Sequence, residues 1–254
     1  MNESDRRIHL AAVREEQGEE TCVRRFGEIA ARNRTEAVRL LNEEEMTYPC
    51  LFVLRPSIDR WNLQQRMRTR YAIALEITKQ VLNIQENRSS RNYLADAGDR
   101  AHDALIWMLR TGSAEEYPSE EYQQVLDVVV SVLINLYQDT EILPDVAALI
   151  FARRKRGQNV HELIWAYFRS HDARALALAA ERLPQADEAE AEFICDLLGM
   201  SYEKPIDGPA AYERYSRWLR ENESRLVFNE ENKQYTSRPV VCRMDQPAEE
   251  GRAT

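Results

Sequence analysis

A chain of 254 residues with 44% hydrophobic and 30% charged side chains can bury a large core and still present a charged surface. It holds only 8 glycines, which disfavours folds that bind nucleotides through glycine-rich phosphate loops. The net charge of −9 argues against general nucleic-acid binding, because neutralising phosphates requires clustered Lys and Arg. This balance favours a soluble all-α protein.

The cysteines, the apolar runs and the N-terminal segment together indicate the cellular compartment. Cys22, Cys50, Cys195 and Cys242 are widely separated and form no CxxC pair, which favours reduced, buried thiols over a metal site or a disulfide framework. No apolar run reaches the roughly 18 residues that a membrane span needs. The N-terminal segment also lacks the basic-then-apolar order of a signal peptide. We therefore expect a cytoplasmic protein with no membrane partner.

The first 46 residues predict a charged N-terminal region that is helical. Residues 3–20 fit a charged, weakly amphipathic helix. Apolar residues then recur at helical spacing over residues 20–45, with a break at Asn33 or Thr35, either of which could cap a second short helix. The pattern predicts a small helical hairpin, separate from the rest of the chain.

Residues 48–56, with the sequence YPCLFVLRP, differ from their surroundings. Five apolar residues stand between Pro49 and Pro56, a run too short for a helix and too hydrophobic for a free loop. We expect an extended segment that lies over the core. Ser57 or Asp59 is then predicted to cap a long helix that runs to about Gln85.

Two further helices are predicted in the middle of the chain. The first covers residues 92–110 and should end before Gly112, because glycine favours the left-handed conformation that follows a helix C-terminus. The second covers residues 119–137, with Ser119 as its cap and acidic residues in its first turn, where the helix dipole favours them.

The stretch 125–137, VLDVVVSVLINLY, is the most hydrophobic part of this second helix. Its β-branched residues are typical of a buried strand. However, Asp127, Ser131 and Asn135 recur at every fourth position, which places them on one helical face. The pattern therefore predicts a helix that apolar residues surround on nearly all sides, with one narrow polar stripe, at the centre of the fold.

Four short helices should follow, at residues 144–156, 159–168, 172–183 and 187–198. The turns between them are short, so consecutive helices must fold back on one another. A last helix begins at Asp207, and residues 226–235 predict a small β-hairpin or extended cap. The tail at residues 245–254 is predicted to be disordered.

The helix pairs 144–171 and 172–199, each about 30 residues long, resemble those of HEAT- or armadillo-type α-solenoids. The similarity covers residues 120–219 and is one of architecture, without a diagnostic repeat motif. It implies that residues 47–244 form one all-α, repeat-like domain, in which antiparallel helices stack as a short solenoid. The C-terminal hairpin would then cover the exposed end of the stack.

The histidines offer weak catalytic candidates. His161-Glu162 begins like a zinc-protease helix, but Trp165 stands where the second histidine is needed, and His171 turns to another face. We expect capping and surface roles here.

Another candidate is an acid–base pair between Asp99 and His102, with Asp103 nearby on the same helix. No nucleophile stands beside these residues, so a surface or half-buried pair is favoured. The runs Glu43–Glu45 and Glu249–Glu250 indicate solvated charge rather than metal sites. No catalytic group, metal or cofactor is predicted.

Two features are candidates for binding a partner. Arg153, Arg154, Lys155 and Arg156 form the strongest basic cluster, which exceeds what a helix C-terminus needs and could contact an acidic partner, a phosphate or RNA. The second feature is the polar stripe Asp127, Ser131 and Asn135. In armadillo proteins, asparagines of the inner helix bind the backbone of an extended peptide, which the resemblance implies for Asn135. Bonds to a neighbouring helix are the simpler expectation.

These observations lead to two hypotheses of function. The first is a non-catalytic scaffold or adaptor that binds a protein partner, which the helix series and the lack of a catalytic set favour. The alternative is an all-α enzyme or small-ligand-binding protein, with a pocket between helices 59–85 and 119–137 that uses Tyr71, His102 or Asp127. Nucleic-acid contact through residues 153–156 is a weaker third option.

Overall fold

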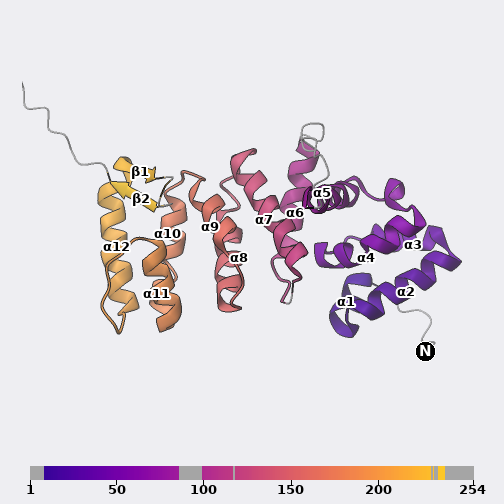
Figure 1. The fold of residues 1–254 in the computed structure, drawn as a ribbon, viewed down its shortest axis with the longest axis horizontal. Coiled ribbons are helices and arrows are strands. Elements are labelled where there is room, and N and C mark those ends of the chain that lie inside the picture. The colour runs from indigo at the N-terminus through magenta and orange to yellow at the C-terminus, as the bar shows by residue number, and fades with distance from the viewer. Residues whose placement is uncertain (1–8, 86–98, 117, 230, 232–233, 238–254) are drawn as a thin grey trace, which may run out of the picture. The chain divides into compact units, whose positions relative to one another are not determined.

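The computed structural model describes residues 9–85, 99–116, 118–229, 231 and 234–237. These residues form twelve α-helices and one two-stranded antiparallel hairpin (Figure 1), which confirms the prediction of an all-α protein with a small C-terminal β cap. The chain divides into two compact units, residues 1–175 and 176–254. The boundary predicted after residue 46 falls inside the first unit.

Unit 1 contains nine complete α-helices and a short 3-10 helix within its described residues. They are α1 (Leu10–Gln17), α2 (Glu19–Arg32), α3 (Arg34–Leu41), α4 (Tyr48–Trp61), η2 (Gln64–Arg66), α5 (Thr69–Gln85), α6 (Asp99–Gly112), α7 (Glu120–Asn135), α8 (Leu143–Lys155) and α9 (His161–Phe168). The predicted break at Asn33 is confirmed, since its Oδ1 accepts a hydrogen bond from the amide of Glu36 at the start of α3.

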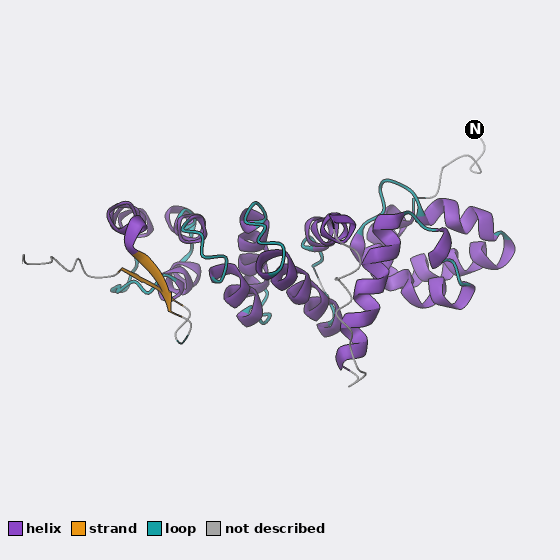
Figure 2. Ribbon diagram, turned by 90° about the horizontal axis from the view of Figure 1, so that it is seen from above, coloured by secondary structure: helices purple, strands orange, loops and turns teal. Residues whose placement is uncertain are grey.

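The helix α10 (Arg174–Ala180) contains the boundary between the units. Unit 2 continues with η3 (Leu183–Gln185), α11 (Glu188–Leu197), α12 (Gly208–Asn222), η4 (Glu223–Arg225), β1 (Leu226–Asn229) and β2 (Gln234–Ser237). The two strands, drawn orange in Figure 2, pair in a register that places Phe228 opposite Tyr235. The predicted hairpin is therefore confirmed.

The prediction of an extended segment at residues 48–56 is wrong, because these residues lie in α4. Pro49 stands in the first turn, where amides have no partner within the helix, so its missing N–H removes no bond. Pro56 stands inside the helix, where a proline destabilises the helix by about 3 kcal/mol. Several large apolar side chains offset this cost, since each contributes about 1.5–3 kcal/mol on full burial; those without exposed surface are Tyr48, Leu51, Leu54 and Ile58.

The predicted long helix at residues 59–85 is also corrected. Its first residues belong to α4, which ends where Asn62 adopts a left-handed conformation with φ of 52°. Asparagine tolerates this conformation better than most residues, so it can end the helix here. The short helix η2 follows, and α5 starts only at Thr69.

Gly112 does not follow the end of its helix, as the sequence predicted, but forms the last residue of α6. A Cβ at this position would lie 2.7 Å from the hydroxyl of Tyr122 and 3.1 Å from the ring of Tyr48. The Tyr122 hydroxyl donates a hydrogen bond to the carbonyl oxygen of Gly112. The glycine is thus required by close packing between helices. Residues 92–98 of the predicted helix lie outside the described residues.

The central helix is confirmed as α7. The hydroxyl of Ser119 accepts a hydrogen bond from the amide of Tyr122, as a cap should. The helix packs against α5, α6 and α9. Its buried face is Tyr122, Val125, Leu126, Val129, Val130, Leu133 and Ile134.

In unit 2, the helix starts were predicted correctly. Asp187 accepts a hydrogen bond from the amide of Glu190 at the start of α11, and Asp207 accepts one from the amide of Ala210 in α12. Gly208 brings the first turn of α12 against η3, where a Cβ would overlap the carbonyl oxygen of Leu183.

The thiols of Cys22, Cys50 and Cys195 are buried and free, as predicted, whereas Cys242 and the predicted tail at 245–254 lie outside the described residues. Among the helices of the described residues, none combines the length and the apolar character that crossing a bilayer requires.

Candidate functional site

The two predicted binding features meet inside unit 1. The guanidinium of Arg153 on α8 donates a hydrogen bond to Oδ1 of Asp127 on α7 at 2.5 Å, and another to the carbonyl oxygen of Gln123 at 3.0 Å. Arg153 is buried. Burial raises the pKa of the Asp127 carboxyl above its ordinary value, while Arg153 acts in the opposite direction. The side chain of Arg153 is therefore enclosed and paired within unit 1, and a partner-binding role for this residue stays a prediction.

The remaining residues of the two features lie nearer the surface. The Asn135 amide donates a hydrogen bond to the hydroxyl of Ser131 at 3.0 Å, so these two polar groups of the stripe bond each other. Arg154, Lys155 and Arg156 are exposed at the end of α8, and Arg156 donates to the carbonyl oxygen of Glu115. Binding of a partner by these exposed cations stays a prediction.

His102 pairs with a residue that the sequence did not suggest. Its Nε2 lies 2.8 Å from Oδ2 of Asp139, in the loop after α7, and its ring packs on Tyr137 with centroids 4.8 Å apart. The structure thus pairs His102 with Asp139 rather than with Asp99. Asp139 is distant in sequence, so spacing along one helix could not identify it.

The residues proposed for a pocket between the 59–85 and 119–137 helices do not converge. Tyr71 is buried, its hydroxyl donates to the carbonyl oxygen of Glu43, and its ring packs against Trp107. His102 and Asp127 are bonded to Asp139 and Arg153, as described above. Each of the three therefore has a different neighbourhood, and they form no common site.

His161 stands at the start of α9, where its amide donates to Oδ1 of Asn159. Asn159 therefore satisfies one of the free amides of the helix start, although Val160, rather than Asn159, occupies the cap position. This local role agrees with the capping function expected for the segment around His161.

Unit 2 carries a groove that the sequence analysis did not identify. It lies between α12 and β2 and has a volume of about 590 Å³. Tyr215 and Trp218 of α12 form one wall, with ring centroids 5.4 Å apart and planes inclined by 34°. The other residues that line it are Leu198, Gly199, Met200, Ser201, Arg214, Gln234, Tyr235 and Thr236. We call this hollow the α12–β2 groove.

The α12–β2 groove is mainly apolar and carries one charge. Among the described residues that line it, Arg214 is the one charged side chain, although the whole chain has a net charge of −9. Arg214 is exposed and forms no ion pair with a described carboxylate. Gly199, Ser201 and Thr236 are also exposed, so the groove opens to solvent.

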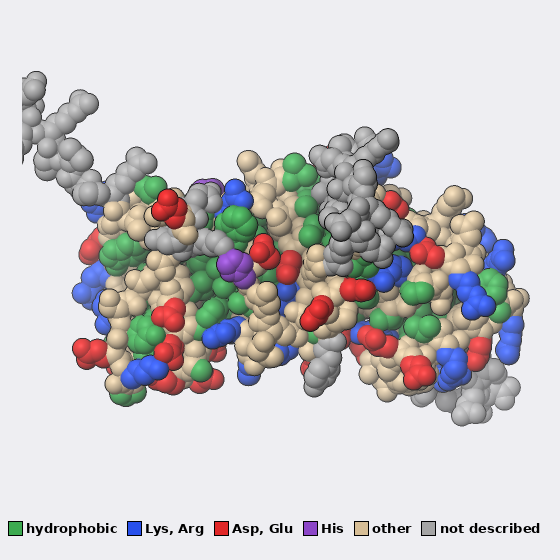
Figure 3. Space-filling view, viewed as in Figure 1, with side chains coloured by type: hydrophobic (Ala, Val, Ile, Leu, Met, Phe, Trp, Pro, Cys, Tyr) green, Lys and Arg blue, Asp and Glu red, His purple; other side chains and the backbone are tan. Residues whose placement is uncertain are grey.

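The polar side of the groove is held in place from α11. The Gln234 amide donates a hydrogen bond to the carbonyl oxygen of Asp196, at 3.3 Å, and the Gln234 side chain covers Gly199. On the face shown in Figure 3, Lys and Arg side chains are interspersed with Asp and Glu. The groove therefore combines an aromatic wall, a fixed polar edge and an unpaired cation.

Comparisons with known proteins found no matching family model, no matching curated protein and no matching solved structure.

Proposed function

We propose that this protein is a non-catalytic adaptor that holds a segment of a protein partner in the α12–β2 groove. The partner segment would place an aromatic or aliphatic side chain against Tyr215 and Trp218, and a carboxylate beside Arg214. The observation that carries the proposal is that, among the described residues, the one charged side chain lining this mainly apolar groove of an acidic chain is an arginine without a described ion-pair partner. Aromatic and arginine side chains are also the residue types that contribute most to protein interfaces.

The stacking of the helices supports a scaffold role. In unit 1, helices that are neighbours in sequence pack on each other, as in the pairs α4–α5, α5–α6, α6–α7 and α8–α9. This is the contact pattern of HEAT- and armadillo-type repeats. A solenoid arrangement remains part of the proposal.

The experiment starts with a defined peptide probe. A phage-displayed library of random peptides is selected on the immobilised full chain. The proposal predicts enrichment of sequences with an apolar residue next to Asp or Glu. One enriched sequence is then synthesised with a fluorescent label, and its dissociation constant is measured by anisotropy at low and high salt. Higher salt should weaken binding, because it screens exposed charges.

Two variants of α12 test the position of the site. R214E removes an exposed ion pair of about 0.5–1 kcal/mol and replaces it with a repulsion of similar size, which raises the dissociation constant about ten-fold. R217E is the matched control. Arg217 is also exposed on α12 and forms no ion pair with a described residue, but it does not line the groove. W218A should weaken binding as well, since it removes the aromatic wall.

The proposal is refuted if the selection enriches no peptide. It is equally refuted if R214E and R217E change the affinity by the same factor, because the effect would then reflect the overall charge rather than the groove.

A further inference from the structure

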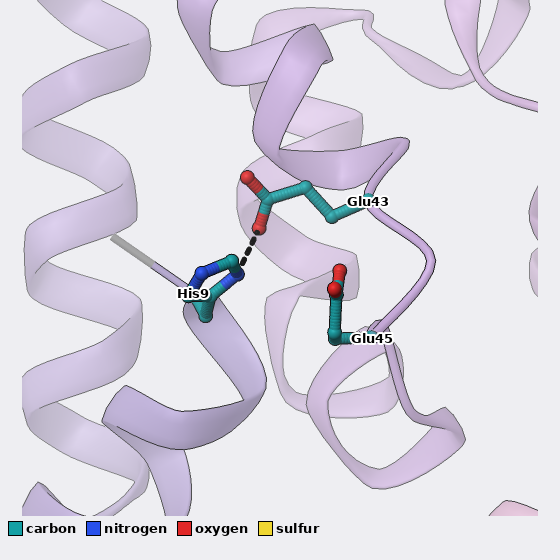
Figure 4. Close-up of side chains that lie close together, drawn as sticks. All are labelled: His9, Glu43 and Glu45. Carbon is teal, nitrogen blue, oxygen red and sulfur yellow. Dashed lines mark ion pairs between the residues drawn. The ribbon is translucent and has the colours of Figure 1, made fainter. Parts of the chain in front are cut away.

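Three side chains with metal-binding atoms converge in unit 1, away from the α12–β2 groove. His9 precedes α1, whereas Glu43 and Glu45 lie in the loop between α3 and α4. One ligand atom from each residue lies within 4.8 Å of the others. Figure 4 shows the imidazole of His9 and the two carboxylates facing a common space. Only the fold brings His9 to this acidic loop.

The imidazole nitrogen that faces the loop lies at ion-pair distance from the Glu43 carboxylate, which Figure 4 marks with a dashed line, and the His9 side chain is 39% exposed. Nδ1 of His9 is 3.2 Å from Oε2 of Glu43, but the atom is buried and has no hydrogen-bond partner among the described residues. A cation between the ring nitrogen and the carboxylate oxygen would satisfy the lone pairs of both atoms.

Glu43 is held in the orientation that a ligand needs. Its Oε1 accepts a hydrogen bond from Nη1 of Arg39 at 2.9 Å, which leaves Oε2 turned toward His9. Its backbone carbonyl oxygen accepts a hydrogen bond from the hydroxyl of Tyr71 at 2.8 Å. Metal-binding carboxylates are commonly fixed by such outer contacts, which orient the free oxygen.

Glu45 supplies the third carboxylate or imidazole group that could bind a metal ion. It is exposed and forms no hydrogen bond or ion pair with any described residue. Glu44, between the two ligands, lies 3.7 Å from Arg68, and its side chain is 84% exposed. The loop therefore presents Glu43 and Glu45, but not Glu44, to His9.

We propose that His9, Glu43 and Glu45 bind one divalent transition-metal cation. One imidazole and two carboxylates form a mixed nitrogen–oxygen set that suits Zn²⁺ or Mn²⁺, whereas Mg²⁺ and Ca²⁺ prefer oxygen ligands. Zn²⁺ should bind more tightly than Mn²⁺, as it does at most nitrogen–oxygen sites. The bound ion would join the start of α1 to the loop before α4, so its primary effect is on the stability of this end of unit 1.

The test is calorimetric titration of the full chain with ZnCl₂, MnCl₂ and MgCl₂ after treatment with a chelator. We expect one equivalent of Zn²⁺ to bind, with affinity in the order Zn²⁺, Mn²⁺, Mg²⁺. H9A and E45Q should each weaken Zn²⁺ binding by at least ten-fold, since each removes a ligand. E44Q makes the same charge change one residue away, and H161A removes another imidazole; both should bind Zn²⁺ like the wild type.

A second measurement checks that the ion acts on the folded chain. Zn²⁺ should raise the thermal unfolding temperature of the wild type and of E44Q, but not of H9A, because a ligand that binds the folded state alone stabilises it. Circular dichroism confirms that H9A and E45Q are folded before titration. The proposal is overturned if Zn²⁺ does not bind, if H9A and E45Q bind it as tightly as the wild type, or if E44Q loses affinity to the same extent as E45Q.

Discussion

Removing one partner of the ion pair between Asp127 and Arg153 should be among the most destabilising changes in unit 1. The side chain of Arg153 is 2% exposed, and its guanidinium has two acceptors, Asp127 and the carbonyl oxygen of Gln123. D127A would leave a buried cation with only the neutral acceptor. We expect this substitution to lower the free energy of unfolding by about 3–5 kcal/mol, the usual range for breaking a buried pair from one side.

The double variant D127A/R153M separates the unpaired charge from the loss of packing. Methionine retains much of the length of the arginine stem without its charge. Because no uncompensated ion remains, the double variant should recover most of the stability that D127A loses. The sum of the single effects should thus exceed the effect of the double variant by several kcal/mol.

The pair Arg24–Glu28 on α2 provides a matched surface control. Its two side chains are 61% and 51% exposed, and the charged atoms lie 3.2 Å apart. R24A should change the free energy of unfolding by no more than about 0.5 kcal/mol. The assay is urea unfolding of the full chain, followed by helical circular dichroism and by tryptophan fluorescence. A loss below about 1 kcal/mol in D127A, or a loss in D127A no larger than that in R24A, would refute the reasoning.

Two further predictions concern packing and buried polar groups. G112A should lower the free energy of unfolding by about 1–3 kcal/mol, because its Cβ would come within 2.7 Å of a buried hydroxyl. The control G27A, at a helix position with open space around it, should raise the free energy of unfolding by about 0.5–1 kcal/mol. Similar effects in the two variants would contradict the packing argument. T78V should lower the free energy of unfolding by about 1–3 kcal/mol, because it leaves the buried hydroxyl of Tyr48 unpaired. Y48F should lower it less, since Thr78 keeps its hydrogen bond to the carbonyl oxygen of Ala74. Urea unfolding measures both variants, and a larger loss in Y48F would contradict this order.

The starts of several helices could be predicted from sequence because capping is a local interaction. Ser119, Asp187 and Asp207 each accept a hydrogen bond from an amide three residues ahead, so the signal lies within a single turn. The same locality explains the failure at Pro49 and Pro56. Two prolines so close together argue against one helix through both, although Pro49 suits a first turn and only Pro56 opposes the helix interior; the burial that stabilises α4 comes from other helices.

The site residues were harder to predict because they come from distant segments. Successive residues of a helix point about 100° apart, so a run of four cations on α8 cannot all face solvent. The run does not show that Arg153 is the residue that turns inward. A charged Asp127 within the most hydrophobic stretch of α7 was the available signal that a buried partner exists.

The same limit applies to the two proposed sites. His9 meets the loop of Glu43 and Glu45 only through the folding of α1 against its neighbours, so the acidic run alone indicated solvated charge. The α12–β2 groove draws its lining from the segment that follows α11, from the middle of α12 and from β2. The sequence places Arg214, Tyr215 and Trp218 on one helix, but it does not show that strand β2 lies opposite them.

Because Gly208 has no side chain, its position affects how the rest of α12 is oriented. A Cβ at this position would overlap the Leu183 carbonyl oxygen, so the first turn of α12 packs directly on η3, and this close packing opposes a roll of the helix about its axis. A roll of about 100°, the angle of one residue, would point Arg214 and Trp218 away from β2. The close packing of the first turn therefore helps to set the direction in which α12 presents Arg214, about two turns further along.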